Sequence, residues 1–246
     1  MQPTQLLFQT DSYLKTFSGR VLDVEERNVV LDKTAFFPRG GGQMADRGTL
    51  RSLDSWFDVV AVEKRGDFVF HTLEHTGTLS PGNLIDGAID WDFRYQMMRT
   101  HSALHVLCGV IYQEYRASVT GCQMYVDRAR MDFTLSDLTR ERVRNIEKRS
   151  NEVIREGRPV KVTFLPRAQA NLRPELIRTK INLVPPHVDP VRVVEIQDLD
   201  VQADGGTHVA NTLEIGGITI TKSENKGREN RRLEIVLSPL HGGEHI

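Results

Sequence analysis

The pattern of hydrophobic and polar positions changes character near residue 90. Up to that point, short runs of alternating apolar and polar residues are separated by turns such as Arg65-Gly66-Asp67 and Pro81-Gly82-Asn83, which is typical of β-strands. Strands are expected at residues 19–24, 28–31, 49–53, 56–62, 68–72 and 85–91. Many short strands joined by glycine-rich turns predict a small β-barrel or sandwich domain over residues 1–90.

From Asp92 onward the apolar positions take on helical spacing. Residues 92–116 contain no proline, and a charged helix is expected from Thr139 to Gly157, where the glycine stops the helix. A hairpin is expected at 117–134, strands at 160–165, 191–196, 218–222 and 233–237, and short helices and loops in 166–186. These elements predict that an α+β domain with an antiparallel sheet occupies residues 91–246, so that the whole chain is α+β.

Composition excludes several classes of protein. The 246 residues include only 2 cysteines, too few for a secreted fold held together by disulfides. The first ten residues lack both a basic start and a long apolar run, so no secretory signal peptide is expected. The densest apolar stretch, residues 105–112, is too short to cross a bilayer. We therefore expect a cytoplasmic protein with no membrane partner.

The net charge of −1 hides segments of opposite sign. Residues 128–180 hold 14 basic and 7 acidic side chains, a net of +7, whereas residues 1–95 carry −4 and residues 181–215 carry −5. By itself a basic run of this kind is most often a solvated helix face. A polyanionic partner therefore needs support from elsewhere in the sequence.

Candidate chemistry begins with the run His101-Ser-Ala-Leu-His105. Side chains four positions apart on a helix share a face and can bind one metal ion, although such a pair alone is a weak signal. Asp204 and His208 repeat this spacing around two glycines, which let the backbone turn both side chains toward one point. Alone, Asp204-Gly-Gly-Thr would be a simple turn. Together the two pairs predict a metal site, and three imidazoles with one carboxylate suit Zn²⁺ best.

The remaining histidines and Cys108 are weaker candidates. Cys108 shares a helix face with His101, but about 10 Å of helix rise separates the two residues, too far for one ion to bind both. We expect Cys108 in the core, His71, His75 and His187 at the surface, and His241 and His245 in a loose tail.

A glycine-rich run, Phe36-Phe-Pro-Arg-Gly-Gly-Gly-Gln43, is the second informative motif. Backbone N–H groups in such a loop can hold phosphate, but the run is neither a Walker A motif nor a dinucleotide fingerprint. On its own it favours a tight β-turn.

Four blocks, in this order, resemble the editing domain of alanyl-tRNA synthetase and its freestanding AlaX relatives. They are Gly40-Gly-Gly-Gln43-x₂-Asp46-x-Gly48, Arg99-Thr-His101-Ser-Ala-Leu-His105, Asp204-Gly-Gly-Thr-His208 and Lys226-Gly-Arg-Glu-Asn-Arg-Arg232, with further matches at Arg192-Val-Val-Glu-Ile196 and Glu214-Ile-Gly216. The resemblance covers residues 36–237. A β domain that carries the glycine-rich motif, without a synthetase catalytic domain, is similar to the medium-length AlaX form.

The resemblance implies a trans-editing, metal-dependent deacylase that hydrolyses mischarged alanine tRNA without ATP and so protects translation fidelity. Ser-tRNA(Ala) is the expected main substrate, with Gly-tRNA(Ala) as a second. A small synthetase pocket discriminates poorly against a rival that differs by a hydroxyl or one methylene, so a second site must remove the errors. A metal can either activate water, lowering its pKa toward ~7, or orient the substrate, and both roles stay open because four protein ligands close a zinc site.

By resemblance, one Zn²⁺ per chain is held by His101, His105, Asp204 and His208. The family usually has cysteine where this chain has Asp204. Aspartate keeps the charge but offers a harder oxygen, so selectivity for softer metals is expected to fall. A role for Asp204 as a base rather than a ligand is an alternative.

The remaining site residues are assigned roles toward the tRNA. Gln43 is expected to hold the terminal adenosine or the attacking water, and Thr120 and Thr207 are candidates to read the serine hydroxyl. Phosphate contacts are expected from the basic segment 128–180 and from Arg39, Gly40, Gly41, Gly42, Lys226, Arg228 and Arg231.

Three alternative functions remain open at this point. One is a non-catalytic RNA-binding protein with a structural metal, and another is a general metal-dependent esterase that acts on small substrates. The third is editing of threonine tRNA, because threonyl-tRNA synthetase has a similar metal core. The sequence sets no oligomeric state.

Overall fold

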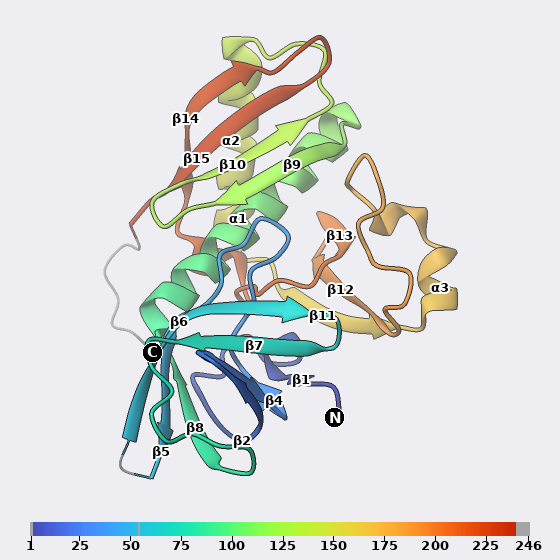
Figure 1. The fold of residues 1–246 in the computed structure, drawn as a ribbon. Helices are drawn as coiled ribbons and strands as arrows, with labels where there is room; N and C mark the ends of the chain where they lie inside the picture. Colours follow the sequence, from blue (N-terminus) through green and yellow to red (C-terminus); the bar gives the residue numbers. More distant parts are fainter. Residues whose placement is uncertain (1, 54, 240–246) are drawn as a thin grey trace. The chain divides into compact units, whose positions relative to one another are not determined.

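The computed structural model describes residues 2–53 and 55–239 (Figure 1). The chain forms two compact units, Met1–Met97 and Met98–Ile246, and each is described by itself. Within the described residues no helix combines the length and apolar character that a membrane crossing requires.

The first unit is built on a closed six-stranded barrel in the order β2-β3-β7-β6-β5-β8. Its strands are β2 (Thr16–Glu25), β3 (Asn28–Leu31), β5 (Gly48–Ser52), β6 (Ser55–Arg65), β7 (Phe68–Leu73) and β8 (Leu84–Ile89). Alternate residues of β7 and β8 point inward and are buried, and Val21, Leu50 and Phe57 contribute to the core from other strands. The short strands β1 (Gln5–Leu6) and β4 (Lys33–Thr34), which lie outside the barrel, pair in parallel.

The barrel closes where β5 runs against β8, and Gly48 makes this approach possible. A Cβ atom on Gly48 would lie 2.1 Å from the backbone oxygen of Ala88, well inside van der Waals contact. The glycine of the sequence motif therefore serves barrel closure.

The helix α1 (Trp91–Tyr115) begins where the sequence pattern changes period, and its later turns belong to the second unit. That unit contains an antiparallel four-stranded sheet of order β14-β15-β10-β9 and an antiparallel three-stranded sheet of order β11-β12-β13. The strands are β9 (Val119–Met124), β10 (Ala129–Phe133), β11 (Val160–Leu165), β12 (Val191–Ile196), β13 (Asp200–Ala203), β14 (Ile218–Asn225) and β15 (Arg231–Leu237). The predicted α+β class with antiparallel sheets and a barrel is confirmed.

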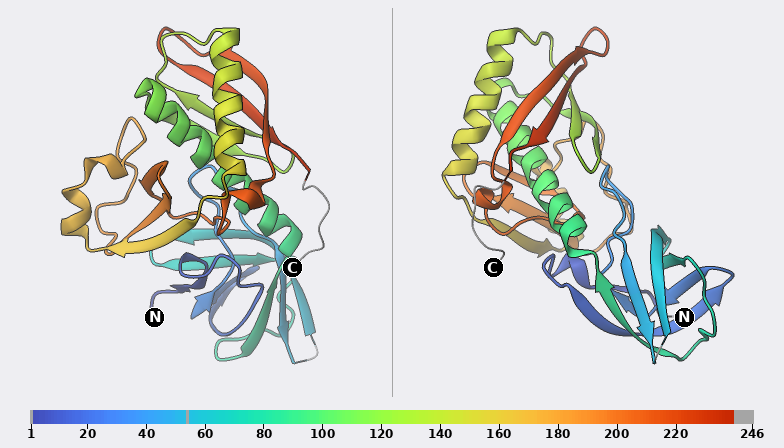
Figure 2. Two further views of the ribbon diagram at one scale, coloured as in Figure 1. Left: turned by 180° about the vertical axis from the view of Figure 1, so that it is seen from behind. Right: turned by 90° about the vertical axis from the view of Figure 1, so that its left-hand side faces the viewer.

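The charged helix α2 (Arg140–Arg155) begins and ends where the sequence predicts. The Thr139 side chain caps its first turn by accepting from the Arg142 N–H, and Gly157 ends it with a φ of +69°. Helix α2 packs against β14 (Figure 2). The Asn151 side-chain amide donates to the carbonyl oxygen of Ile218, and its oxygen accepts the N–H of Ile218. The expected short helices of residues 166–186 are α3 (Arg167–Asn171) and η2 (Pro174–Leu176), and η3 (Thr212–Ile215) lies further along.

The prediction that His71 lies at the surface is wrong, because its side chain is buried. His71 points into the barrel from β7, where its Nε2 lies 2.8 Å from the hydroxyl of Thr34 and its Nδ1 lies 3.1 Å from the carbonyl oxygen of Val29. Burial lowers its pKa to about 4. His75 and His187 are exposed as expected, whereas His241 and His245 lie outside the described residues.

Candidate metal centre

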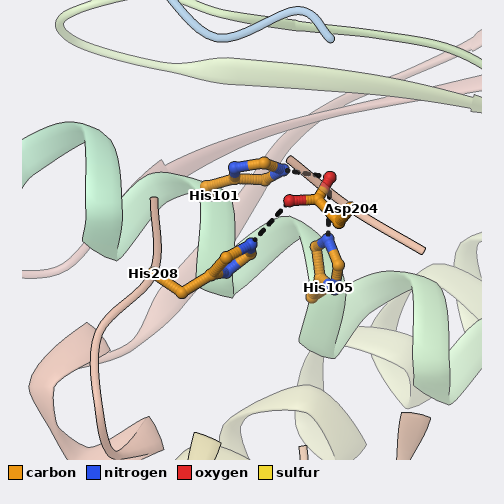
Figure 3. Close-up of side chains that lie close together, drawn as sticks. All are labelled: His101, His105, Asp204 and His208. Carbon is orange, nitrogen blue, oxygen red and sulfur yellow. Dashed lines mark hydrogen bonds and ion pairs between the residues drawn. The ribbon is translucent and has the colours of Figure 1, made fainter. Parts of the chain in front are cut away.

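Two distant segments bring together the four side chains that the sequence pairs as His-x₃-His and Asp-x₃-His. The middle of α1 presents His101 and His105 on consecutive turns, with ring centroids 5.1 Å apart. Asp204 and His208 lie on the loop that follows β13 (Figure 3). The ligand atoms of all four side chains lie within 4.8 Å of one another, so this cluster can hold a metal ion.

The carboxylate of Asp204 lies close to a ring nitrogen of each histidine. Asp204 Oδ1 lies 3.0 Å from His208 Nε2, and Asp204 Oδ2 lies 3.5 Å from His101 Nε2 and 3.8 Å from His105 Nε2. Bonds of about 2.0–2.1 Å to a tetrahedral zinc place neighbouring ligand atoms about 3.3 Å apart. The Asp204–histidine distances are therefore of the size that one shared ion can span.

Burial keeps the ring nitrogens available as ligands. It lowers the pKa of His101 to about 4, and it lowers the pKa of His208 well below the ordinary value. Burial alone would raise the pKa of Asp204, but the three histidine side chains outweigh it and hold that pKa well below its ordinary value. At neutral pH His101 and His208 are thus uncharged and Asp204 is ionised, the forms that bind metal.

The ligand residues are held by neighbouring groups. Asp204 Oδ1 accepts the N–H of Gly206 at 2.7 Å, while buried Arg192 donates to the backbone oxygen of Asp204 at 2.9 Å. On the helix side, the Ser102 hydroxyl accepts the N–H of Val209 and lies 3.2 Å from Nδ1 of His208. These contacts fix the side-chain directions before any ion binds.

The two threonine candidates lie in different places. Thr207 is fully buried beside His208 in the ligand loop. Thr120 is exposed on β9, and its hydroxyl donates to the side-chain oxygen of Asn230 at 2.7 Å, which connects it to the β14–β15 turn. Cys108 is buried as expected, and its sulfur accepts a hydrogen bond from Gln202.

The glycine-rich motif of the first unit forms the tight turn that the sequence favours. Gly40 and Gln43 exchange backbone hydrogen bonds of 2.8 and 3.2 Å, and the two residues between them have positive φ, +57° at Gly41 and +85° at Gly42. Arg39 and Gly41 are exposed, whereas Gln43 is fully buried.

Of the three basic residues predicted to contact phosphate near the β14–β15 turn, two are exposed and one is buried. Lys226 and Arg228 are exposed in the β14–β15 turn. Arg231 is buried, and its guanidinium donates to the backbone oxygens of Gly227, Arg228, Asn230 and Ser136. The carbonyl contacts of Arg231 thus organise the turn that displays Lys226 and Arg228.

Sequence reasoning missed two polar side chains that surround the ligands, Ser102 and Asp200. Both are buried, and both approach an outer ring nitrogen of a ligand histidine, at 3.2 Å for Ser102 and 3.8 Å for Asp200. A signal was present for Asp200, because Asp200, Gln202 and Asp204 are spaced by two and so share one face of an extended chain.

Two family models match the chain. The model described as the threonyl and alanyl tRNA synthetase second additional domain matches residues 191–234. The model of the class II (A) tRNA synthetases matches residues 8–93. The first match includes Asp204 and His208, and the second includes the glycine-rich turn.

Curated relatives match over almost the full length. The alanyl-tRNA editing protein AlaX-M of Saccharolobus solfataricus is 37% identical over 96% of this chain and 100% of its own length. The protein of the same name from Methanosarcina acetivorans is 40% identical over 95% of this chain and 99% of its own. The alanine–tRNA ligase of Ignicoccus hospitalis is 41% identical over 95% of this chain, which spans 26% of the ligase. The chain therefore belongs to the AlaX-M family of alanyl-tRNA editing proteins.

Proposed function

We propose that this protein hydrolyses the ester bond of mischarged alanine tRNA in the cytoplasm, with Ser-tRNA(Ala) as its main substrate and Gly-tRNA(Ala) as a second. The observation that carries the proposal is the cluster of His101, His105, Asp204 and His208 in a chain that matches AlaX-M proteins end to end. The proposed resident ion is one Zn²⁺ per chain.

The ion would supply Lewis acidity for the ester or its attacking water. Asp204 is the most exposed of the four side chains, with 21% of it accessible against 7% or less for the histidines, so substrate is expected to reach the cluster from the Asp204 side. A carboxylate with a pKa well below its ordinary value is a weak base, which favours ligation over proton abstraction at Asp204. In the reaction, water adds to the ester carbonyl, the bond to the ribose oxygen breaks, and that oxygen takes up a proton.

We further propose that exposed basic groups hold the tRNA through its phosphates. Lys226 and Arg228 on the β14–β15 turn and Arg39 beside the glycine-rich turn are accessible for this purpose. Arg231 acts through the turn that it organises. Gln43, together with the turn of Gly40, Gly41 and Gly42, is proposed to hold the terminal nucleotide, and Thr207 to face the serine side chain.

The test is to incubate the purified protein with alanine tRNA charged with serine, glycine or alanine, and to follow loss of the ester. We expect selective release of serine, abolished by His105→Ala and by a chelator, and unaffected by the control His187→Ala, which changes an exposed histidine. Metal bound without release of serine would favour a structural metal and contradict the proposal. Release from threonine tRNA, or turnover of small esters without tRNA, would assign the site to another substrate.

A further inference from the structure

The outer ring nitrogen of His105 lacks a partner in the described part of the chain. Nε2 of His105 faces Asp204, while Nδ1 is buried and makes no hydrogen bond to any described residue. A buried polar group left in this state costs about 1–3 kcal/mol. Oδ2 of Asp200 lies 3.8 Å from this nitrogen, somewhat beyond hydrogen-bond distance.

Asp200 is a buried carboxylate held by two other side chains. Only 1% of its side chain is exposed, its Oδ1 accepts from Nε of Arg178 at 2.9 Å, and the Gln202 amide donates to Oδ2. The guanidinium of Arg178 lies 3.9 Å from the ring centroid of Tyr112. This arrangement balances the charge of Asp200 and fixes its direction, so the carboxylate does not need His105 for its own stability.

The backbone is also shaped to bring Asp200 close to α1. Gly109 lies one turn after His105, and a Cβ atom there would lie 3.0 Å from Cβ of Asp200 and 2.7 Å from Cγ of Leu199. One turn further, the Gln113 amide donates to the carbonyl oxygen of Leu199 at 2.9 Å. A larger residue than glycine would hold Asp200 away from the helix.

We propose that Asp200 is a positioning residue for the metal ligand His105. Its carboxylate accepts the Nδ1–H of His105, which fixes the tautomer whose Nε2 lone pair points at Asp204 and the ion. The proposal rests on the metal site proposed above. Ligand histidines ordinarily donate their second N–H to a carboxylate, carbonyl or water, and closing the 3.8 Å gap takes less than about 1 Å of movement.

The test compares zinc affinity in the wild type, Asp200→Asn and a matched control, Glu195→Gln, which removes one acidic charge from the exposed side of neighbouring β12. In Asp200→Asn the amide oxygen stays on Arg178, so the NH₂ group faces His105 and favours the wrong tautomer. Competition with a chromophoric chelator should show about 10–100-fold weaker zinc binding in Asp200→Asn. Glu195→Gln should bind as the wild type does.

The tautomer of His105 distinguishes a positioning role of Asp200 from a purely structural one, because only the positioning role fixes the proton on Nδ1. Long-range proton–nitrogen NMR spectra of the metal-free wild type should show the proton of His105 on Nδ1, with the signal identified by its loss in His105→Ala. The assignment needs a folded His105→Ala protein, but it needs no variant of Asp200. A proton on Nε2 in the wild type, or wild-type zinc affinity in a folded Asp200→Asn protein, would overturn the positioning role alone. Failure of the wild type to bind zinc would overturn the metal site together with it.

Discussion

At the scale of single residues, Asp204 is the one member of the cluster of four that is not a histidine. Its carboxylate bridges toward all three histidines through two oxygens, at 3.0 to 3.8 Å. A thiolate has one sulfur and a longer bond to zinc, about 2.3 Å against about 2.0–2.2 Å for oxygen. The residue at this position therefore affects which ions the site prefers more than whether it binds one.

We expect Asp204→Cys to keep one bound zinc and to gain preference for softer ions. The ratio of cadmium to zinc affinity should rise, since a soft sulfur ligand replaces a hard oxygen. Metal analysis after equilibration with both ions measures the ratio, and Asp204→Asn, which lacks the charge, should bind either ion weakly. An unchanged ratio in Asp204→Cys would mean that residue 204 is not a ligand.

His71 shows how one buried histidine makes stability depend on pH. Burial in the barrel lowers its pKa from 6.5 to about 4. Between pH 6.5 and pH 4, His71 is therefore protonated in the unfolded chain but remains neutral in the folded barrel. The shifted pKa of His71 therefore leaves the free energy of unfolding unchanged above pH 6.5 and lowers it as the pH falls toward 4. The pKa difference corresponds to about 3 kcal/mol at most.

We expect His71→Gln to flatten this pH dependence, because glutamine can bond Thr34 but does not titrate. Urea unfolding of the metal-free protein at pH 7 and pH 5 gives the free energies, followed by tryptophan fluorescence. Both tryptophans, Trp56 and Trp91, lie in the first unit, so the signal reports on the barrel unit. The exposed His75→Gln should keep the wild-type slope, and an equal slope in His71→Gln would contradict the assignment.

At the scale of elements, periodicity predicted most of the fold and missed strands whose polar residues face inward. Alternating strands and the long helix α1 follow from spacing, and Thr139 and Gly157 mark the ends of α2. In contrast, β13 was missed because Asp200 and Gln202 point toward α1, which reverses the usual pattern of polar residues on the exposed face. His71 was misplaced because a polar residue near the end of a strand was expected to face solvent, whereas β7 turns its side chain into the barrel.

The difference between local spacing and long-range packing also explains which residues of the cluster region could be predicted from the sequence. Both pairs of the cluster could be proposed because each lies within five consecutive residues, whereas Ser102 and Asp200 approach histidines more than ninety positions away in the chain. Contacts between distant segments follow from packing, which no local spacing reveals.

Barrel closure depends on the close pairing of β5 with β8. Gly48→Ala should lower the free energy of unfolding by about 3 kcal/mol, because the added methyl would lie 2.1 Å from the oxygen of Ala88 and force the strands apart. The control is Gly40→Ala, where the nearest atom to an added Cβ is 3.9 Å away. Denaturant unfolding followed by tryptophan fluorescence measures both, and equal stabilities would contradict the role of Gly48.

At the scale of the whole molecule, the near-zero net charge conceals a basic surface in the second unit. Several arginines of the segment 128–180 are paired with acids, among them Arg142 with Asp137 and Arg149 with Glu152. Three exposed basic residues of α2, Arg140, Arg144 and Lys148, recur every four positions and make no ion pair with any described residue. Three of the positive charges in this segment thus lie on one face of one helix.

We expect the double variant Arg144→Ala, Lys148→Ala to raise KM for charged tRNA while kcat stays unchanged. Each lost phosphate contact should reduce the slope of log affinity against log salt by about one. Steady-state deacylation at several salt concentrations measures both quantities. The control Lys64→Ala removes an exposed lysine from the acidic first unit and should leave the slope unchanged. A fall in kcat instead would place these residues near the reaction.

The positions of the four cluster residues along the chain determine when during synthesis an ion could bind all of them. His101 and His105 are made early, whereas Asp204 and His208 follow only after strands β9 to β13 have been synthesised. An ion that binds all four side chains would close a loop comprising most of the second unit, much as a crosslink does, and would stabilise the folded unit late in its synthesis. A cell short of the ion would then accumulate chains that are correctly shaped but easily cleaved by proteases, and editing would decline through loss of protein as well as loss of chemistry.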